Sequence, residues 1–347
     1  MRNSTFLGYL AEVTGRKDFK CASQQALVPV SRQLGNMKNI GAFTGIASTL
    51  YVTNHLSRLW KNDYLLQSFL QEQTHTLKEM IPKDERLDMI GGVAGCSIVL
   101  LQLYEQLKDP KLLELAKQCG DRLLQTVQRM QQGMGWKVLV SEKPLAGFSH
   151  GVSGMAWTLF KLTNVTGNKN YQLVAEQALT FERTLFSRKH LNWYDLRMFN
   201  GKSNLERGVM PVAWCHGAPG IALSRLLISP YKNDSFIQKE IEVGIATTLQ
   251  RGFGINHSLC HGDLGNLDIL IFAANQLNDN KLVQTVNDYS QSILQDIKNR
   301  GWVTGLHTIN NESPSLMLGL AGIGMGLLKI WSPNYIPSIL RLQAPAV

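Results

Sequence analysis

The stretch WCHGAPGIALSRLL (residues 214–227) has a counterpart in LCHGDLGNLDILIF (259–272). In each, a Cys-His pair stands just before a Gly-x-x-Gly step and an apolar run. The same small-residue motif, or a near relative of it, opens four further apolar stretches, at 41–56, 91–104, 150–163 and 318–331. Aligned on the second glycine of each motif, the six copies fall at positions 45, 95, 154, 220, 265 and 322. A recurrence with this period predicts a repeat architecture.

The stretches after the glycine motifs carry few charges, which is typical of buried helices. Between them lie segments whose apolar residues recur every three or four positions, as in half-buried helices. These segments are 62–80, 110–132, 170–186 and 280–299. Each repeat therefore predicts a helical hairpin, and a ring of six or seven hairpins gives one helical barrel inside another. The glycine motifs then start the inner helices, all at one end.

The first hairpin is expected to be truncated. Residues 6–15 resemble the tail of an inner helix and 17–34 its outer partner, but no Gly-x-x-Gly precedes Phe6. No stretch is typical of an interdomain linker, so residues 1–347 are predicted to form a single domain.

Composition narrows the class of protein. Of the 347 residues, 44% are hydrophobic and 18% charged, which indicates a globular chain. No apolar run reaches the roughly 18 residues of a membrane span, and the N-terminus lacks the pattern of a signal peptide. The five cysteines suggest no disulfide framework, and we expect a cytoplasmic protein with reduced thiols. The net charge of +9 is spread along the chain, so nucleic acid is not expected, although an acidic peptide partner is compatible with it.

Cys215 and Cys260 occupy matching places in adjacent repeats, and each is followed by a histidine. Thiolate and imidazole are the ligands that zinc favours, so the repeated pair predicts a zinc site. If His216 and His261 both bind, the site is closed and structural. If only one binds, a position stays open for catalysis. The residues leave that choice open, and the alternative is that both cysteines are small buried hydrophobes.

Two further residues stand at the starts of inner helices. His150 directly precedes the glycine motif of the stretch at 150–163, and its titration range suits proton transfer near neutral pH. Asp88 stands three residues before Gly91, where a carboxylate commonly caps a helix. His257 and Asp263 flank the second Cys-His pair as weaker candidates, for a supporting role around a metal or for loop and cap positions.

The chain resembles a known family, the lanthionine-forming cyclases, and most closely the C-terminal cyclase domain of class II lanthipeptide synthetases. The resemblance runs over essentially the whole chain. The motifs that carry it are IGAFTGIASTLYV (40–52), LDMIGGVAG (87–95), GFSHGVSGMAWTL (147–159), PVAWCHGAPGIALSRL (211–226), SLCHGDLGNLDIL (258–270) and SLMLGLAGIGMGLLKI (315–330).

The resemblance implies an all-α fold, an α/α toroid of about seven hairpins with zinc at the end of the barrel. It implies Cys215, Cys260 and His261 as zinc ligands, with the fourth position taken by a substrate cysteine thiolate. Asp88 and His150 match the acid/base pair of the family. The chain departs from the pattern in three ways: it has no dehydratase domain, it has His216 where some members have tyrosine, and Pro211 stands where some have arginine.

The function implied is a zinc-dependent cyclase that forms lanthionine or methyllanthionine rings. A peptide cysteine adds to dehydroalanine or dehydrobutyrine in a dehydrated precursor peptide, and a separate dehydratase is a further partner. Two alternatives stay open. One is a related enzyme that adds glutathione to dehydroamino acids, and the other is a truncated remnant that binds zinc or peptide without turnover. A helical-toroid glycosidase is more distant, because it needs paired carboxylates.

Overall fold

In a computed structural model, residues 2–199, 202–203, 210–306 and 312–345 are described, and within them the chain is mainly helical. The α-helices in these ranges are α1 (Arg2–Thr14), α2 (Lys17–Ser31), α3 (Ile46–Trp60), α4 (Asp63–Met80), α5 (Val93–Leu107), α6 (Pro110–Thr126), α7 (Val152–Thr166), α8 (Lys169–Thr184), α9 (Ala218–Ile228), α10 (Ser235–Arg251), α11 (Asp263–Leu277), α12 (Asn280–Arg300) and α13 (Leu320–Trp331). None of them combines the length and the hydropathy needed to cross a membrane.

Sheet structure is confined to short hairpins in the described ranges. The strands are β1 (Gln128–Arg129), β2 (Met134–Gly135), β3 (Phe186–Ser187), β4 (Asn192–Trp193), β5 (Met198–Phe199) and β6 (Lys202–Ser203). They pair in order as three antiparallel two-stranded ladders. Two 3₁₀ turns, η1 (Leu34–Asn36) and η2 (Ile81–Lys83), complete the elements. The expected all-α class is confirmed.

The predicted amphipathic segments coincide with helices, and two of them end earlier than expected, α8 by two residues at Thr184 and α6 by six. The segments at 62–80, 170–186 and 280–299 become α4, α8 and α12. The segment predicted at 110–132 is helical only to Thr126, because Val127 is extended and β1 then pairs with β2. Gly133, at φ +72°, supplies the left-handed turn between those two strands.

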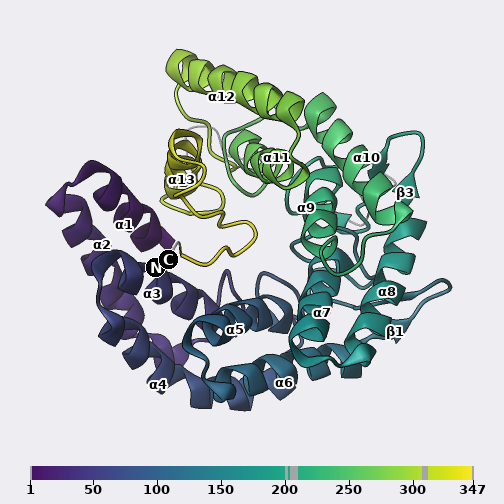
Figure 1. Ribbon diagram of the computed structural model, residues 1–347, viewed down its shortest axis with the longest axis horizontal. Coiled ribbons are helices and arrows are strands. Elements are labelled where there is room, and N and C mark those ends of the chain that lie inside the picture. The colour runs from purple at the N-terminus through teal and green to yellow at the C-terminus, as the bar shows by residue number, and fades with distance from the viewer. Residues whose placement is uncertain (1, 200–201, 204–209, 307–311, 346–347) are drawn as a thin grey trace. The chain divides into compact units, whose positions relative to one another are not determined.

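The chain divides into two compact units. One unit comprises residues 1–36, 52–68 and 248–347, and in it α1 packs on α2 and α13, while α11 packs on α12 and α13 (Figure 1). The other comprises 37–51 and 69–247, and in it α7 lies between α5 and α9, with α6 packed on α5 and α8 on α7. Both units contain helices from several repeats, and the single-domain organisation stays a prediction.

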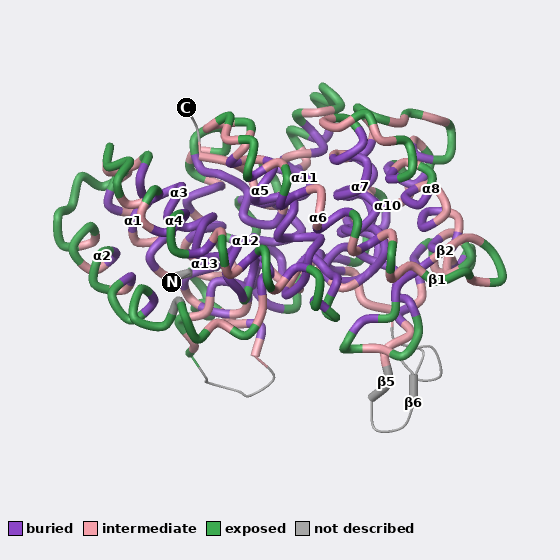
Figure 2. The backbone as a smooth tube through the Cα atoms, turned by 90° about the horizontal axis from the view of Figure 1, so that it is seen from below, coloured by how far each residue is buried: buried purple, intermediate pink, exposed green. Residues whose placement is uncertain are grey.

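The helices that follow glycine motifs form the buried layer, as predicted. In Figure 2, α5 and α7 are largely buried whereas α2 is largely exposed. The outer helix α6 buries one face only, at the three- and four-residue spacing of an amphipathic helix. The residues on that face are Leu112, Leu115, Ala116, Cys119, Gly120 and Leu123.

The six aligned glycines share one steric role. A Cβ atom built on each would stand about 2 Å from the carbonyl oxygen of the residue six positions earlier, too close for any side chain. The glycine–carbonyl pairs and distances are Gly45–Asn39 2.2 Å, Gly95–Met89 2.2 Å, Gly154–Phe148 2.3 Å, Gly220–Trp214 2.0 Å, Gly265–Leu259 1.9 Å and Gly322–Leu316 1.8 Å. In these six repeats the loop thus folds back onto the first turn of the inner helix, and this close approach explains the glycine recurrence in the sequence.

The first unit also buries a histidine in α3. The Nδ1 atom of His55 lies 2.7 Å from the Tyr9 hydroxyl, and its Nε2 atom lies 3.1 Å from the Gln343 carbonyl oxygen. Because a carbonyl oxygen can only accept, Nε2 carries the proton and Nδ1 accepts from Tyr9. Burial lowers the pKa of His55 from 6.5 to about 3, so the ring is neutral in the folded protein.

This histidine makes stability depend on pH. In the unfolded chain, His55 takes up a proton once the pH falls below its ordinary pKa. In the folded chain, the His55 ring stays unprotonated down to about pH 3. The contribution of neutral His55 to the free energy of unfolding is therefore complete above pH 6.5. It is lost as pH falls below that value, by up to about 1.4 kcal/mol per pH unit. We expect His55→Gln to lose less free energy of unfolding than wild type between pH 7.5 and 5 in urea titrations.

The matched control is His75→Gln, because the side chain of His75 is 80% exposed. This variant should keep the wild-type pH slope. A slope for His55→Gln equal to that of wild type would show that His55 is not buried in its neutral form.

Candidate metal centre and the Asp88–His150 pair

Asp88 and His150, predicted from different repeats, meet in the second unit. Asp88 lies in the loop before α5 and His150 in the loop before α7, and His150 Nδ1 is 2.6 Å from Asp88 Oδ2. A carboxylate can only accept, so Nδ1 carries the proton and Nε2 is left to exchange a proton with another molecule. The side chains of Asp88 and His150 are 7% and 23% exposed, so the pair is shielded but reachable.

Asp88 also caps its own loop. Its second oxygen, Oδ1, accepts hydrogen bonds from the backbone N–H groups of Ile90 (3.0 Å) and Gly91 (2.8 Å). One oxygen of Asp88 thus meets His150 and the other holds the loop before α5, whereas the first N–H group of α5, that of Val93, is capped by Asp84 instead. The backbone bonds fix the carboxylate before any substrate arrives.

Asp84 supports the Asp88 loop and was missed by the sequence analysis. Its Oδ2 atom accepts from the backbone N–H groups of Leu87 and Val93, both at 3.0 Å. Burial raises the pKa of Asp84, although these backbone hydrogen bonds act in the opposite direction. The available signal was a short acidic side chain in a tight turn just before a glycine motif.

Ser149 joins three loops of the second unit. Its carbonyl oxygen accepts from the N–H of Met89 (3.1 Å), beside Asp88. Its own N–H (3.3 Å) and hydroxyl (3.1 Å) both donate to the carbonyl oxygen of Cys215. The loops of Asp88, His150 and Cys215 are therefore connected through one residue, which no motif singled out.

Aromatic side chains pack beneath these loops. The ring of Trp214, next to Cys215, lies 5.4 Å from that of Phe43 and 5.9 Å from that of Phe148, measured between centroids. Phe148 in turn contacts Trp157 of α7 at 5.7 Å. Buried aromatic contacts of this kind anchor the polar loops to the helices.

His216 turns into the core of the second unit. It is 1% exposed, its Nδ1 atom is 3.4 Å from the Ala146 carbonyl oxygen, and its ring stacks on that of His150 at 6.0 Å. Its Nε2 atom is buried and has no hydrogen-bond partner among the described residues. Burial lowers the pKa of His216, so the ring is held neutral.

The second Cys-His pair lies in the first unit. The Nε2 atom of His261 is 2.9 Å from the carbonyl oxygen of Gly305, and Cys260 N–H donates to the Met317 carbonyl oxygen at 2.9 Å. Since Nε2 must donate to a carbonyl, Nδ1 is the nitrogen that can bind a metal. A hydrogen bond of this kind orients a histidine ligand and sets its tautomer.

Cys215, Cys260 and His261 are the candidate metal ligands. Cys215 belongs to the second unit and Cys260 and His261 to the first, and all three residues are partly buried. Two thiols and one imidazole are a donor set that suits zinc, and three ligands leave a fourth position open. Cys96 and Cys119 are buried elsewhere, Cys21 is exposed, and His216 is not in the group.

His257 and Asp263 serve the surrounding backbone. His257 Nε2 is 2.8 Å from Asp296 Oδ2, and its Nδ1 accepts from the N–H of Val303 at 2.9 Å. This second bond fixes the segment that leads to Gly305, the partner of His261. Asp263 accepts from the N–H of Gly254 at 3.0 Å. His257 therefore orders the loop behind a candidate ligand rather than offering one itself.

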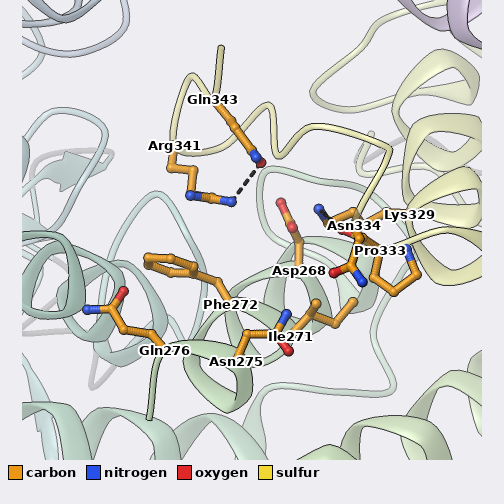
Figure 3. A pocket seen from close by; sticks show the side chains of 10 residues that line it. All are labelled: Asp268, Ile271, Phe272, Asn275, Gln276, Lys329, Pro333, Asn334, Arg341 and Gln343. Carbon is orange, nitrogen blue, oxygen red and sulfur yellow. Dashed lines mark hydrogen bonds between the residues drawn. The ribbon is translucent and has the colours of Figure 1, made fainter. Parts of the chain in front are cut away.

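A separate pocket of about 390 Å³ lies in the first unit, against the C-terminal half of α11. Figure 3 shows Asp268, Phe272 and Asn275 of α11 on one side, with Lys329 and Arg341 opposite. His261 precedes the first residue of α11, so the pocket lies along the helix away from it. A helix rises about 1.5 Å per residue, so Asn275 lies about 20 Å from His261 along the axis of α11.

Sequence comparison places the chain among known proteins. A family model described as lanthionine synthetase C-like protein matches residues 3–341. The chain is 29% identical over 279 residues to the lacticin 481/lactococcin biosynthesis protein LcnDR2 of Lactococcus lactis subsp. lactis, covering 76% of this chain and 27% of that protein. It is 26% identical over 261 residues to the nisin biosynthesis protein NisC of the same organism, covering 67% and 60%. The match thus spans only part of both relatives.

Structure comparison identifies the fold. Nisin cyclase, an α/α toroid, superposes with a TM-score of 0.74 at 19% identity, covering 98% of this chain and 89% of that one. An α-1,6-mannanase of Salegentibacter sp. HEL1_6 superposes with a TM-score of 0.56 at 11% identity, covering 86% and 88%. The expected α/α toroid is confirmed. At such identities these likenesses show the fold and not the chemistry.

Gly147 offers a test of how closely the His150 loop meets the Cys215 loop. It has φ +108°, and a Cβ atom there would stand 2.9 Å from the Cys215 carbonyl oxygen and 3.1 Å from His216 Cα. We expect Gly147→Ala to lower the free energy of unfolding by about 3 kcal/mol, from backbone strain and the clash together. Urea unfolding measures it.

Gly167→Ala is the matched control, because Gly167 also has positive φ (+74°) but has open space around it. It should cost only the strain, about 1 kcal/mol. Equal losses in the two variants would show that the Cys215–His216 backbone does not confine Gly147.

Proposed function

Because the chain belongs to the lanthionine synthetase C-like protein family, we propose that it is a zinc-dependent cyclase that forms thioether rings in a dehydrated precursor peptide. The observation that carries the proposal is the Asp88–His150 pair, joined through Ser149 to the loop of Cys215. Relatives named for nisin and lacticin 481 biosynthesis support a peptide substrate of this class. A separate dehydratase would supply the dehydroamino acids.

Cys215, Cys260 and His261 would hold the zinc ion, His261 through Nδ1 because Nε2 is engaged by Gly305. When bound, zinc lowers the pKa of a coordinated thiol so that it is a thiolate at neutral pH. Two anionic sulfurs and a neutral imidazole leave the fourth position for the cysteine of the peptide. The donor set thus suits thiol chemistry better than the three-histidine sites that activate water.

The addition forms one C–S and one C–H bond from a thiol and a carbon–carbon double bond. The sulfur attacks the β-carbon, and the electron pair of the double bond moves toward the α-carbon and its carbonyl, giving an enolate. The thiol proton balances the reaction when it is delivered to the α-carbon. His150 is the proposed carrier of that proton through Nε2, since Nδ1 is held by Asp88.

Asp88 would serve His150 in two ways. Its carboxylate fixes the tautomer and the orientation of the ring, and it stabilises the imidazolium that exists while His150 carries the proton. The backbone bonds from Ile90 and Gly91 hold that carboxylate still, so little reorganisation is needed during the reaction.

Metal content tests the ligand set. Each of Cys215→Ala, Cys260→Ala and His261→Ala should lose most of its zinc, because two remaining ligands hold the ion weakly. Cys119→Ala removes a fully buried cysteine outside the group and should keep about one zinc per chain, as in wild type. Elemental analysis of purified protein measures this. Full zinc in any of the three ligand variants would remove that residue from the site.

Free thiols test the reaction itself. Wild-type protein, a dehydrated cysteine-containing peptide and an alkylating reagent report ring formation as loss of alkylation at unchanged peptide mass. Thiol counts that match the uncatalysed control would contradict the cyclase. Addition that requires glutathione and adds its mass would support the glutathione-adding alternative, and a zinc-loaded protein without turnover would support the remnant.

The Asp88–His150 pair is tested by kinetics. His150→Gln and Asp88→Asn should lower kcat by about 10²-fold or more, the usual size of an acid–base contribution, with zinc content unchanged. Asp109→Asn is the control, because Asp109 only caps the exposed start of α6. Wild-type kcat in His150→Gln would exclude His150 as the proton carrier.

A further inference from the structure

A cluster of buried charges lies beside the His150 loop in the second unit. Glu182 of α8 and Arg225 of α9 both have fully buried side chains, with Arg225 Nη2 2.6 Å from Glu182 Oε2. Arg225 Nε also donates to Glu240 Oε2 of α10 at 2.7 Å. Arg183, which is 27% exposed, completes the cluster by donating to Glu240 Oε1 at 2.7 Å. Two carboxylates and two guanidinium groups balance in charge.

Glu182 holds the His150 loop at both ends. Its Oε1 atom accepts from the backbone N–H of Gly147 at 2.8 Å. The Ser153 hydroxyl lies 2.8 and 2.7 Å from the two Glu182 carboxylate oxygens. Gly147 and Ser153 stand three residues before and three residues after His150. The carboxylate therefore closes a clamp around the segment that presents the imidazole.

The same cluster is attached to the helix that follows Cys215. Arg225 lies in α9, which begins directly after the Cys215-His216-Gly217 tripeptide. Arg225 Nη1 donates to the Ser153 hydroxyl at 3.1 Å, and the Ser224 hydroxyl donates to the Ser153 carbonyl oxygen at 2.9 Å. The start of α7 and the body of α9 are thus tied at one point, which limits movement of the His150 loop against α9.

Three other inner-helix loops are capped by simpler means. Asn39 accepts from Gly41 N–H, Asp84 from Leu87 N–H, and Asn256 from Ser258 N–H, each within its own loop. The His150 loop instead takes its cap from an outer helix 35 positions along the chain. Burying an ion pair carries a large desolvation cost that an asparagine avoids. The cluster therefore does more than satisfy one backbone N–H group.

We propose that Glu182 is a positioning residue for the ring-forming reaction, with Arg225 as its counter-charge. Glu182 has no exposed surface, so it acts through its hydrogen bonds to Gly147 and Ser153. These bonds fix the position of His150 Nε2 relative to α9 and to the Cys215 loop that precedes it. This inference rests on the proposed function. It assigns a role in catalysis to a residue that touches neither substrate nor metal.

The test compares Glu182→Gln with Arg183→Gln. Glutamine keeps the size of Glu182 but removes the charge that balances Arg225, so the clamp on the loop loosens. We expect kcat to fall about tenfold, as for a small misplacement of a reacting group, with KM within about twofold and zinc content unchanged. Hydrogen–deuterium exchange of residues 146–151 should become faster.

Arg183→Gln disturbs the same cluster at its exposed edge without touching the loop, and it should keep wild-type kcat and loop exchange. The inference is overturned if Glu182→Gln keeps wild-type kcat and loop exchange, or if both variants lose kcat in proportion to lost stability. If wild type itself forms no rings, the proposed function fails, and the exchange measurement still decides whether Glu182 holds the loop.

Ser153→Ala covers the case in which Glu182→Gln does not fold. It keeps all four charges and removes only the hydroxyl between Glu182 and Arg225. We expect kcat of Ser153→Ala to fall by about twofold to tenfold, because the loss of one neutral hydrogen bond loosens the clamp that positions His150. Wild-type kcat and wild-type exchange at residues 146–151 in Ser153→Ala would overturn the inference.

Discussion

The close approach of a loop carbonyl oxygen to a glycine in the first turn of six inner helices is the constraint on which the rest of the structure depends. A Cβ atom on this glycine would stand about 2 Å from the loop carbonyl oxygen, so no other residue fits there. The glycine must therefore recur wherever the chain makes this turn. The turn also fixes what stands just before it. Asp88, His150, Cys215 and Cys260 all lie between four and seven residues ahead of their second glycine. The functional candidates thus occupy one structural position, presented by different repeats.

That position suits polar chemistry because the start of a helix offers unpaired backbone N–H groups. Asp88 shows the consequence, since one carboxylate oxygen is held by backbone donors while the other meets His150. A carboxylate fixed in this way is preorganised, and the imidazole it orients needs little rearrangement to carry a proton. The Cys215 loop is held from a neighbouring loop, because Ser149 gives both its N–H and its hydroxyl to the Cys215 carbonyl oxygen.

The sequence was sufficient for most of the helices because their signals are local, namely glycine spacing and helical periodicity. The five candidate residues came from the two Cys-His pairs and from the family resemblance, and their roles stay predictions. It was not sufficient for the residues that support them. Glu182 lies in an amphipathic helix where a glutamate is ordinarily solvated, and only packing against α9 reveals that it is buried. Gly305 contributes a carbonyl oxygen to His261, and a backbone atom leaves no trace in residue identity. The early end of α6 likewise follows from strand pairing, which overrides a continuing helical pattern.

The two Cys-His-Gly tripeptides illustrate how identical residues acquire different surroundings. Gly217 has φ +97°, a conformation that favours glycine, whereas Gly262 has φ −127° and is ordinary extended backbone. The backbone that follows the two histidines therefore differs. His216 is carried into the core, where it stacks on His150 and burial keeps it neutral. His261 remains partly buried, with its Nε2 atom on the Gly305 carbonyl oxygen. Two tripeptides with the same residues thus offer their histidines different surroundings, because the packing around each is set by parts of the chain far away in sequence.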